Sequence, residues 1–267
     1  MSEPLFEYMA GELPLLISFP HSGTFVPPTL WSRLSPTARD LPDTDWFVPS
    51  LYSFHRNLGA SILCATHTRY VVDLNRPPDG TALYPGKRET GVCPIECFDG
   101  NPVYLSGEQP NETEIADRLR RYWQPYHDKL AHETHRLVRI HGYCILWDAH
   151  SIRSRIPDLF AGQLPDLNVG TADGRSCAAP YLDQVMGKLA RQKRFSFVSN
   201  GRFKGGYITR HYGQPSAGVH AIQLEIAQCA YLDEARTPEF DQSFAQPLSA
   251  LLEEILSSLS AYRPPKL

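Results

Sequence analysis

The amino-acid sequence predicts an α/β fold in one large domain, and three observations support this prediction. The apolar run Cys144–Trp147 changes within one position to Asp148-Ala-His150-Ser, as a buried strand does at the rim of an α/β sheet. Segments with the 3.6-residue apolar period of amphipathic helices alternate with such strand-like runs. Finally, 267 residues, with 42% hydrophobic and 21% charged side chains, can enclose a substantial core.

Composition and charge restrict the class of protein. With a net charge of −3, the chain lacks the excess of positive charge that binds a polyanion, so nucleic acid is not an expected partner. No apolar run approaches the roughly 20 residues of a membrane span, and no basic region leads into an apolar signal core. Of the six scattered cysteines, only Cys93 and Cys97 form a close pair, and a zinc knuckle would need a second pair to match it. We therefore interpret the cysteines as reduced, structural thiols. We therefore expect a soluble, cytoplasmic protein, and the sequence leaves its oligomeric state open.

The first predicted strand covers residues 13–19 and ends in Pro20-His21-Ser22-Gly23, where glycine allows a sharp turn close to a ligand. Residues 29–58 have a helical pattern interrupted by loops. Within them, Asp43 and Asp45 precede an apolar helical segment. In a purely structural interpretation, Asp43 could cap that helix and Asp45 could lie in its first turn. This interpretation explains the presence of one aspartate well and the presence of both less well.

Residues 60–65 and 69–74 predict two strands joined by residues 66–68. The second strand leads into Asn75-Arg76, and an arginine beside an asparagine offers a forked set of donors for a carboxylate. A solvated surface arginine is the simpler alternative. Residues 80–110 are rich in glycine and proline without a clear period, which predicts a long active-site loop.

The next segment predicts a helix that begins at Asn111, with Glu114 placed three residues later as in a capping box. Its apolar period continues to residue 130, and we interpret its histidines (residues 127, 132, 135 and 141) as structural or solvated. An amphipathic helix over residues 176–194, a short strand over 195–199 and a closing helix over 244–259 are also predicted.

Residues 201–213 combine Arg202, Lys204 and Arg210 with aromatic residues and glycines. This composition predicts a loop around an anionic small molecule, and a flexible solvent loop explains the aromatic residues less well. The last predicted strand, residues 219–227, places Gln223 and Glu225 on one side. A glutamate among leucine and isoleucine is costly to bury unless it holds a cation or a proton, so we favour a functional role for Glu225.

Strand ends and helix starts thus provide His21, an acid from Asp43 or Asp45, His150 and Glu225. Two imidazoles and one carboxylate can hold a zinc ion with a position left for water, and the second carboxylate can accept the proton of that water. A Ser-His-Asp hydrolase is the competing interpretation, with Ser22 or Ser151 as nucleophile. The absence of a Gly-x-Ser-x-Gly motif from the sequence argues against it.

Five motifs, in this order between about residues 13 and 232, resemble the N-formylglutamate amidohydrolase family. They are Pro20-His-Ser-Gly23, Asp43-Thr-Asp-Trp46, Arg69-Tyr-Val-Val-Asp-Leu-Asn-Arg-Pro77, Asp148-Ala-His-Ser151 and Gly206-Tyr-Ile-Thr-Arg210. The resemblance implies one domain over residues 1–267 with a mixed, mostly parallel sheet flanked by helices, similar to zinc-dependent exopeptidases (phosphorylase/hydrolase-like). It also implies hydrolysis of the linear amide C–N bond of N-formyl-L-glutamate to formate and L-glutamate, late in histidine degradation.

On this basis we expect one divalent metal ion, with Zn²⁺ as first choice, bound by His21, Asp45 and His150. Asp148 would lie behind the metal ligands, and Glu225 would take the proton of the attacking water and pass it to the leaving amine. The zinc peptidases place histidine and glutamate three residues apart, whereas His21 has no acid at that spacing. Asp43, Asp45 and Glu225 therefore all remain candidates for the carboxylate ligand.

Asn75 and Arg76 are similar to the Asn-Arg pair with which zinc carboxypeptidases hold a terminal carboxylate, so we expect them to bind the α-carboxylate. Arg210, or Arg202 with Lys204, would meet the side-chain carboxylate. Two alternatives stay open at this point. One is a related metal amidohydrolase that acts on another N-acyl amino acid, and the other is a catalytically silent, metal-free domain that binds an acidic amino acid.

Overall fold

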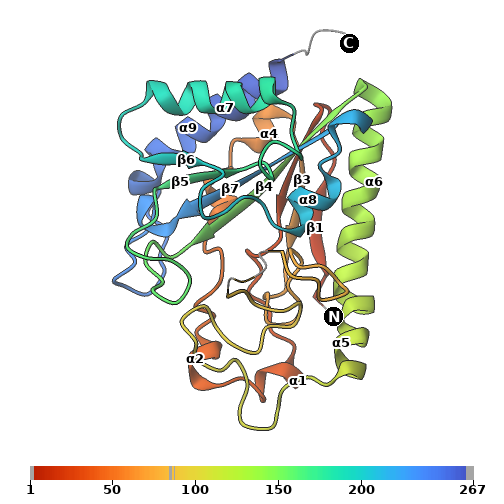
Figure 1. Ribbon diagram of the computed structural model, residues 1–267, viewed down its shortest axis with the longest axis vertical. Helices are drawn as coiled ribbons and strands as arrows, with labels where there is room; N and C mark the ends of the chain where they lie inside the picture. Colours follow the sequence, from red (N-terminus) through yellow and green to blue (C-terminus); the bar gives the residue numbers. More distant parts are fainter. Residues whose placement is uncertain (1–2, 84–85, 87, 263–267) are drawn as a thin grey trace.

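A mixed sheet of seven strands forms the centre of the computed structural model, which describes residues 3–83, 86 and 88–262 (Figure 1). The strand order is β1-β3-β2-β4-β7-β5-β6. The strands are β1 (Phe6–Met9), β2 (Leu15–Phe19), β3 (Ser61–Ala65), β4 (Cys144–Ile152), β5 (Leu167–Gly170), β6 (Phe197–Ser199) and β7 (Val219–Ala227). The β1–β3 and β5–β7 pairs are antiparallel and the other pairs are parallel, which confirms the predicted α/β fold with a mixed, mostly parallel sheet.

The two central strands, β4 and β7, pair in parallel along their whole length, from Cys144 opposite Val219 to Ile152 opposite Ala227. All residues of both strands are buried, as is usual where helices cover both faces of a parallel sheet. Strand β4 extends beyond the apolar run that ends at Trp147, as far as Ile152. The strand continues because its polar residues find buried polar partners on neighbouring segments.

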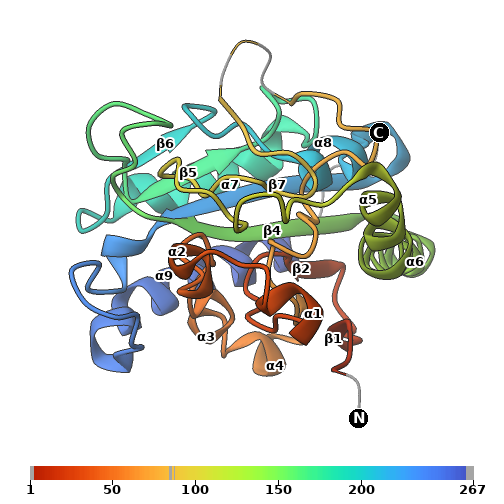
Figure 2. The same ribbon diagram turned by 90° about the horizontal axis from the view of Figure 1, so that it is seen from below.

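Helices cover both faces of the sheet (Figures 1 and 2). On one face, α3, α7 and α9 pack against apolar residues of β2, β4 and β7, and on the other face α6 and α8 do so. The helices are α1 (Pro28–Trp31), α2 (Pro36–Arg39), α3 (Val48–Leu51), α4 (His55–Leu58), α5 (Glu112–Arg118), α6 (Gln124–His141), α7 (Ala179–Arg191), α8 (Tyr207–Tyr212) and α9 (Gln242–Ala261). A π-helical turn, Leu119–Trp123, joins α5 to α6, and 3₁₀ turns occupy Pro215–Ala217 and Gln228–Ala230. Among the described residues, no helix is both long and apolar enough to cross a membrane.

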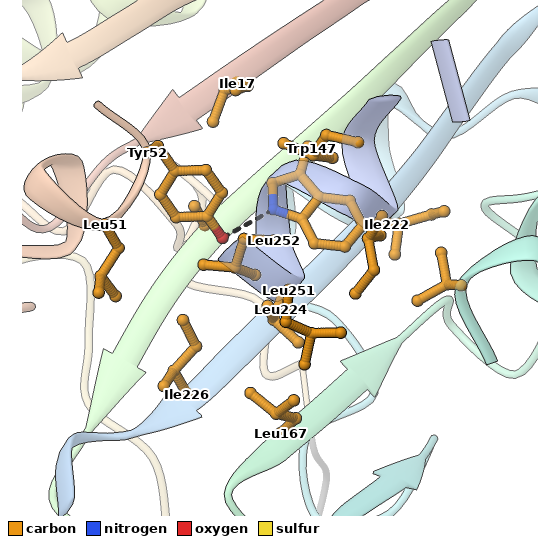
Figure 3. Close-up of a cluster of buried hydrophobic side chains, with 14 of the residues drawn as sticks. Ile17, Leu51, Tyr52, Trp147, Leu167, Ile222, Leu224, Ile226, Leu251 and Leu252 are labelled. Atoms are coloured by element: carbon orange, nitrogen blue, oxygen red, sulfur yellow. Dashed lines mark hydrogen bonds between the residues drawn. The ribbon is translucent and has the colours of Figure 1, made fainter. Parts of the chain in front are cut away.

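The core on the α9 side is built around Trp147, which is fully buried between β4 and α9 (Figure 3). Its indole N–H donates to the hydroxyl of Tyr52 at 2.9 Å, so the one polar atom of this large side chain has a partner. Leu252 from α9 and Ile222 from β7 contribute to the same cluster. This packing fixes the position of β4 in the middle of the sheet.

Two local predictions were wrong, and one alternative interpretation, that of Asp43 as a helix cap, is excluded. Residues 69–74 form turns, not a strand, and the segment is held by a buried ion pair between Arg69 and Asp73. Helix α8 occupies part of the loop expected over residues 201–213. Asp43 caps no helix, because α3 begins only at Val48, and its carboxylate accepts hydrogen bonds from other loop segments. The predicted cap at Asn111 is confirmed, since its side chain accepts from the backbone N–H of Glu114.

The sheet face covered by α6 changes from apolar to polar along the strand direction. Equivalent pairs of residues show the change: Leu16 and Ser18 on β2, Leu146 and Asp148 on β4, Ala221 and Gln223 on β7. The polar members all lie toward the carboxyl ends of these parallel strands. Helices α1 and α2 and the loop after β3 lie beyond this end of the sheet (Figure 1). A functional site is expected at this position in an open α/β sheet.

Candidate metal centre and active site

Two histidines and one aspartate form a buried group at the carboxyl end of the sheet. His21 follows β2, and His150 lies on β4 on the same side as Asp148. Asp45 comes from the segment before α3, which is tied to the first histidine because the N–H of Asp45 donates to the backbone oxygen of His21 at 3.1 Å. One ligand atom from each of the three side chains lies within 4.8 Å of the others. The structure thus brings together the three residues that the sequence suggested as metal ligands.

A second carboxylate lies behind each imidazole. Asp73 Oδ1 is 2.7 Å from His21 Nε2, and Asp148 Oδ2 is 3.1 Å from His150 Nε2. The Nδ1 atoms of the two rings both face Asp45 Oδ2, at 3.8 Å and 3.1 Å. When Nε2 of His21 donates its proton to Asp73, Nδ1 carries the lone pair and is offered to the centre, and Nδ1 of His150 faces the same centre.

Asp73 and its partner Arg69 were not predicted as site residues. Arg69 is buried, its Nη2 donates to Asp73 Oδ2 at 2.5 Å, and its guanidinium lies 4.5 Å from the ring centre of Phe98. Burial alone would raise the pKa of Asp73, but the charges of Arg69 and His21 outweigh it and hold that pKa well below its usual range. A charged Asp73 is the state that accepts a proton from Nε2. The sequence signal was only an Asp two residues before Asn75.

Glu225 on β7 lies directly opposite His150 on β4. It is buried, and burial raises the pKa of its carboxyl group to about 8, although the charge of His150 acts in the opposite direction. Burial would lower the pKa of His150, but the charges of Asp148 and Asp45 outweigh it and raise that pKa well above its usual value. Burial, with a contribution from Arg69, lowers the pKa of His21. The two histidines therefore differ in their affinity for a proton.

The charge balance of the centre fits a bound cation. Four carboxyl groups are buried here, and one buried arginine, Arg69, pairs with one of them, Asp73. The carboxyl groups belong to Asp45, Asp73, Asp148 and Glu225. Uncompensated buried charge is strongly unfavourable, and a divalent ion between two imidazole nitrogens and a carboxylate would neutralise it. Nitrogen and carboxylate oxygen ligands of this kind suit zinc and related metals.

Asn75 is held tightly beside the centre. Its Oδ1 accepts from the backbone N–H of Ile208 at 2.7 Å, so its Nδ2 must point the other way. That atom lies 3.3 Å from Asp148 Oδ2 and 3.0 Å from His150 Nε2. The amide therefore supports the carboxylate behind His150.

An open pocket leads to the centre. Arg76 and Arg202, both predicted to bind substrate, line it together with Glu225 and His150. Its wall also includes the apolar and cationic side chains of Phe98, Ile152, Leu159, Phe203, Arg69 and Arg88. Within the described residues, the guanidinium of Arg76 makes one hydrogen bond, from Nε to the backbone oxygen of Thr90 at 2.9 Å.

The other two predicted cations lie outside this pocket. Lys204 pairs with Asp173 at 2.9 Å, and Arg210 donates from Nε to the backbone oxygen of Gly205 at 2.8 Å. Arg210 lines a separate hollow with Arg175. The loop composition that suggested all three cations carried no information about which way each side chain points.

The competing serine-hydrolase interpretation has no geometric support. The hydroxyl of Ser151 is engaged by Tyr231 at 2.8 Å and by Gln228 Nε2 at 3.3 Å. The hydroxyl of Ser22 is buried and has no hydrogen-bond partner among the described residues. Neither serine is paired with a histidine in the part of the chain that the structure describes.

Comparison with known proteins gives concordant results. The sequence model of a family described as N-formylglutamate amidohydrolase matches residues 13–232. A protein of Pseudomonas putida named N-formylglutamate deformylase is 45% identical over 260 residues, and one of Pseudomonas aeruginosa with the same name is 47% identical over 260 residues. In both cases the match covers 97% of each chain.

Two solved structures share the fold. The crystal structure of N-formylglutamate amidohydrolase from Ralstonia eutropha superposes with a TM-score of 0.79 at 25% identity, covering 95% of each chain. A gene product of Agrobacterium tumefaciens superposes with a TM-score of 0.70 at 17% identity, covering 96% of each chain, and is similar in fold.

Proposed function

The chain belongs to the N-formylglutamate amidohydrolase family, and on this premise we propose that it hydrolyses N-formyl-L-glutamate to formate and L-glutamate. We further propose that the reaction uses one divalent metal ion, with Zn²⁺ as first choice. The observation that carries the metal proposal is the buried group of His21, Asp45 and His150, whose ligand atoms converge within 4.8 Å.

In this proposal His21 and His150 would hold the metal through Nδ1, and Asp45 would hold it through its carboxylate. When bound, the metal supplies a Lewis acid for the formyl carbonyl and for the attacking water. Asp73 would hold the proton on Nε2 of His21, Asp148 lies 3.1 Å from Nε2 of His150, and the two carboxylates would keep both rings in place. Glu225 accepts the proton of the attacking water and returns it to the leaving amine nitrogen.

Arg76 would hold the α-carboxylate of the substrate, because its guanidinium lines the pocket and uses only Nε within the described residues. Asn75, which was expected to share this role, would instead support Asp148, because its Nδ2 faces that carboxylate and its Oδ1 accepts from the N–H of Ile208. Arg202 is our choice for the side-chain carboxylate, because it lines the same pocket whereas Lys204 and Arg210 do not. A planar guanidinium matches a carboxylate with two parallel hydrogen bonds.

The direct test measures formate or acid release from a panel of N-acyl amino acids, with and without a chelator. We expect N-formyl-L-glutamate to give the highest kcat/KM and the chelator to abolish turnover. A strong preference for another acyl group or amino acid would identify a related amidohydrolase. Binding of acidic amino acids without any turnover would instead identify a catalytically silent binding domain.

A further inference from the structure

Gln223 is a buried polar residue of the pocket that the proposed mechanism does not use. It lies on β7, two residues before Glu225 and on the same side of the strand. Its Oε1 accepts a hydrogen bond from the backbone N–H of Gly206 at 2.7 Å, and its Nε2 donates to Glu225 Oε2 at 3.2 Å. The side chain thus connects a backbone group to the carboxyl group of the proposed base.

The chemistry of the two partners fixes the orientation of this carboxamide. A backbone N–H can only donate, so the oxygen of Gln223 has to face Gly206. The nitrogen must then face Glu225. An N–H group directed at Oε2 favours the carboxylate form of Glu225 and one rotamer of its side chain.

The backbone that orients Gln223 is itself rigidly placed. A Cβ atom on Gly206 would lie 2.4 Å from Nδ2 of Asn75, so the glycine is packed directly against that side chain. Gly205 has a φ of +113°, and a Cβ on Gly170 would lie 2.6 Å from its backbone nitrogen. Two residues beyond Gly206, the N–H of Ile208 is bound to Asn75 as well. The N–H of Gly206 is therefore a fixed point on the scaffold.

We propose that Gln223 is a positioning residue that transmits this fixed point to Glu225 and holds its carboxylate toward the reacting water. The inference rests on the proposed hydrolysis and on the role of Glu225 in it. Gln223 acts through the base and makes no contact with the substrate. Its loss should therefore lower kcat and leave KM and metal content unchanged.

A double-mutant cycle tests this coupling with four proteins: wild type, Gln223→Met, Glu225→Gln and the double variant. Methionine has a similar length to glutamine but provides neither the acceptor nor the donor. We expect Gln223→Met to lower kcat by roughly 10-fold, within the range of coupling between residues in contact, with KM within about twofold of wild type. In the Glu225→Gln background the same change should lower kcat by less than about twofold, because the group it positions no longer takes a proton.

Three outcomes would overturn the proposal. They are an unchanged kcat in Gln223→Met, an equal loss of kcat in both backgrounds, or a loss of kcat/KM that a rise in KM explains. Equal losses would indicate a structural effect, and a higher KM would indicate contact with the substrate. If methionine prevents folding, Gln223→Glu keeps the acceptor for the N–H of Gly206 and removes the donor, and it should lower kcat at least as much. A wild-type protein that releases no formate would refute the proposed function itself, and a fully active Glu225→Gln variant would refute the role of Glu225 on which this inference rests.

Discussion

At the scale of single residues, the site depends on which groups hold protons. Two imidazoles each have a carboxylate at Nε2, and their Nδ1 atoms face the carboxylate of Asp45. Glu225 is the remaining carboxyl group, and its pKa is raised to about 8 by burial. This arrangement separates ligands, which must stay deprotonated at one atom, from a base that exchanges its proton in each turnover.

The role of Glu225 as base gives the first prediction. Glu225→Gln keeps the size and most of the hydrogen bonding of the side chain but cannot accept a proton. We expect kcat for formate release to fall by about 10²–10⁴, with metal content unchanged. Turnover near the wild-type value would refute the assignment. Loss of the metal would instead make Glu225 the carboxylate ligand and release Asp45 from that role.

The same residue gives a pH dependence in the metal-free protein. A folded pKa near 8, above the ordinary value of 4.5, means that the folded chain binds this proton more tightly than the unfolded chain. The resulting stability is complete below the ordinary pKa and is lost as pH rises through about 8. The Tm of chelated wild type should therefore fall between about pH 5 and 9, and Glu225→Gln should reduce this fall.

Asp43, whose pKa burial raises to about 6, and His150, whose pKa is raised despite its burial by the charges of Asp148 and Asp45, contribute to the fall in Tm in both proteins. His21, whose pKa burial lowers, opposes the fall, so the test is the difference between the two curves. Parallel curves of Tm against pH for chelated wild type and Glu225→Gln would show that Glu225 does not hold a proton in the folded state.

Arg76 gives the prediction on substrate choice. Arg76→Lys keeps the charge but loses the planar fork, and this should cost about 1.5–3 kcal/mol, roughly 10- to 150-fold in kcat/KM. The preference for N-formylglutamate over N-formylglutamine should survive in this variant and should be eroded in Arg202→Lys. If Arg76→Lys erases the preference instead, the two carboxylate positions are assigned the wrong way round.

At the scale of elements, the sequence predicted the long strands best. Residues 144–147 form a continuous apolar run, which is typical of the middle of a parallel sheet, and the side chains of residues 219–227 alternate between the two sides of a strand. Strands β1 and β5 were not predicted, because a segment of four residues, only some of them apolar, is too short to define a period. Residues 69–74 are as apolar as a strand, but they form part of the loop that follows β3. A turn in which the N–H of Val71 donates to the backbone oxygen of Thr68, and the ion pair between Arg69 and Asp73, hold them there.

The start of α8 is packed directly against the site, because Gly206 lies against the side chain of Asn75. Because a Cβ on Gly206 would lie 2.4 Å from the side chain of Asn75, Gly206→Ala must displace either Asn75 or the turn. We expect formate release to fall at least about 10-fold and the free energy of unfolding to fall by about 1–3 kcal/mol, the usual cost of overpacking.

Gly187→Ala in α7 is the matched control for this substitution, because nothing lies within 4 Å of its added Cβ. It should keep full activity and gain roughly 0.5–1 kcal/mol of stability from higher helix propensity. Equal behaviour of the two alanine variants would show that Gly206 is not constrained by Asn75.

At the scale of the whole molecule, residues far apart in the sequence meet at one end of the sheet. His21, Asp45, His150 and Glu225 lie on four different segments, and each is buried there. The sequence could indicate the residue types, because histidine and acid residues at strand ends are unusual amid apolar runs. It could not indicate which cations face the pocket or that Asp73 lies behind His21, since these depend on how the loops fold over the sheet.

The central claim is that one metal ion, held by this buried group, is needed for hydrolysis. Its most direct test is to strip the protein with a chelator, add Zn²⁺ in steps, and measure bound metal and formate release from N-formyl-L-glutamate in the same samples. We predict that activity rises in proportion to bound metal and saturates at one ion per chain. His150→Ala should show neither tight binding nor recovery, because two remaining ligands hold the ion weakly. Full turnover by wild-type protein without detectable metal would contradict the account.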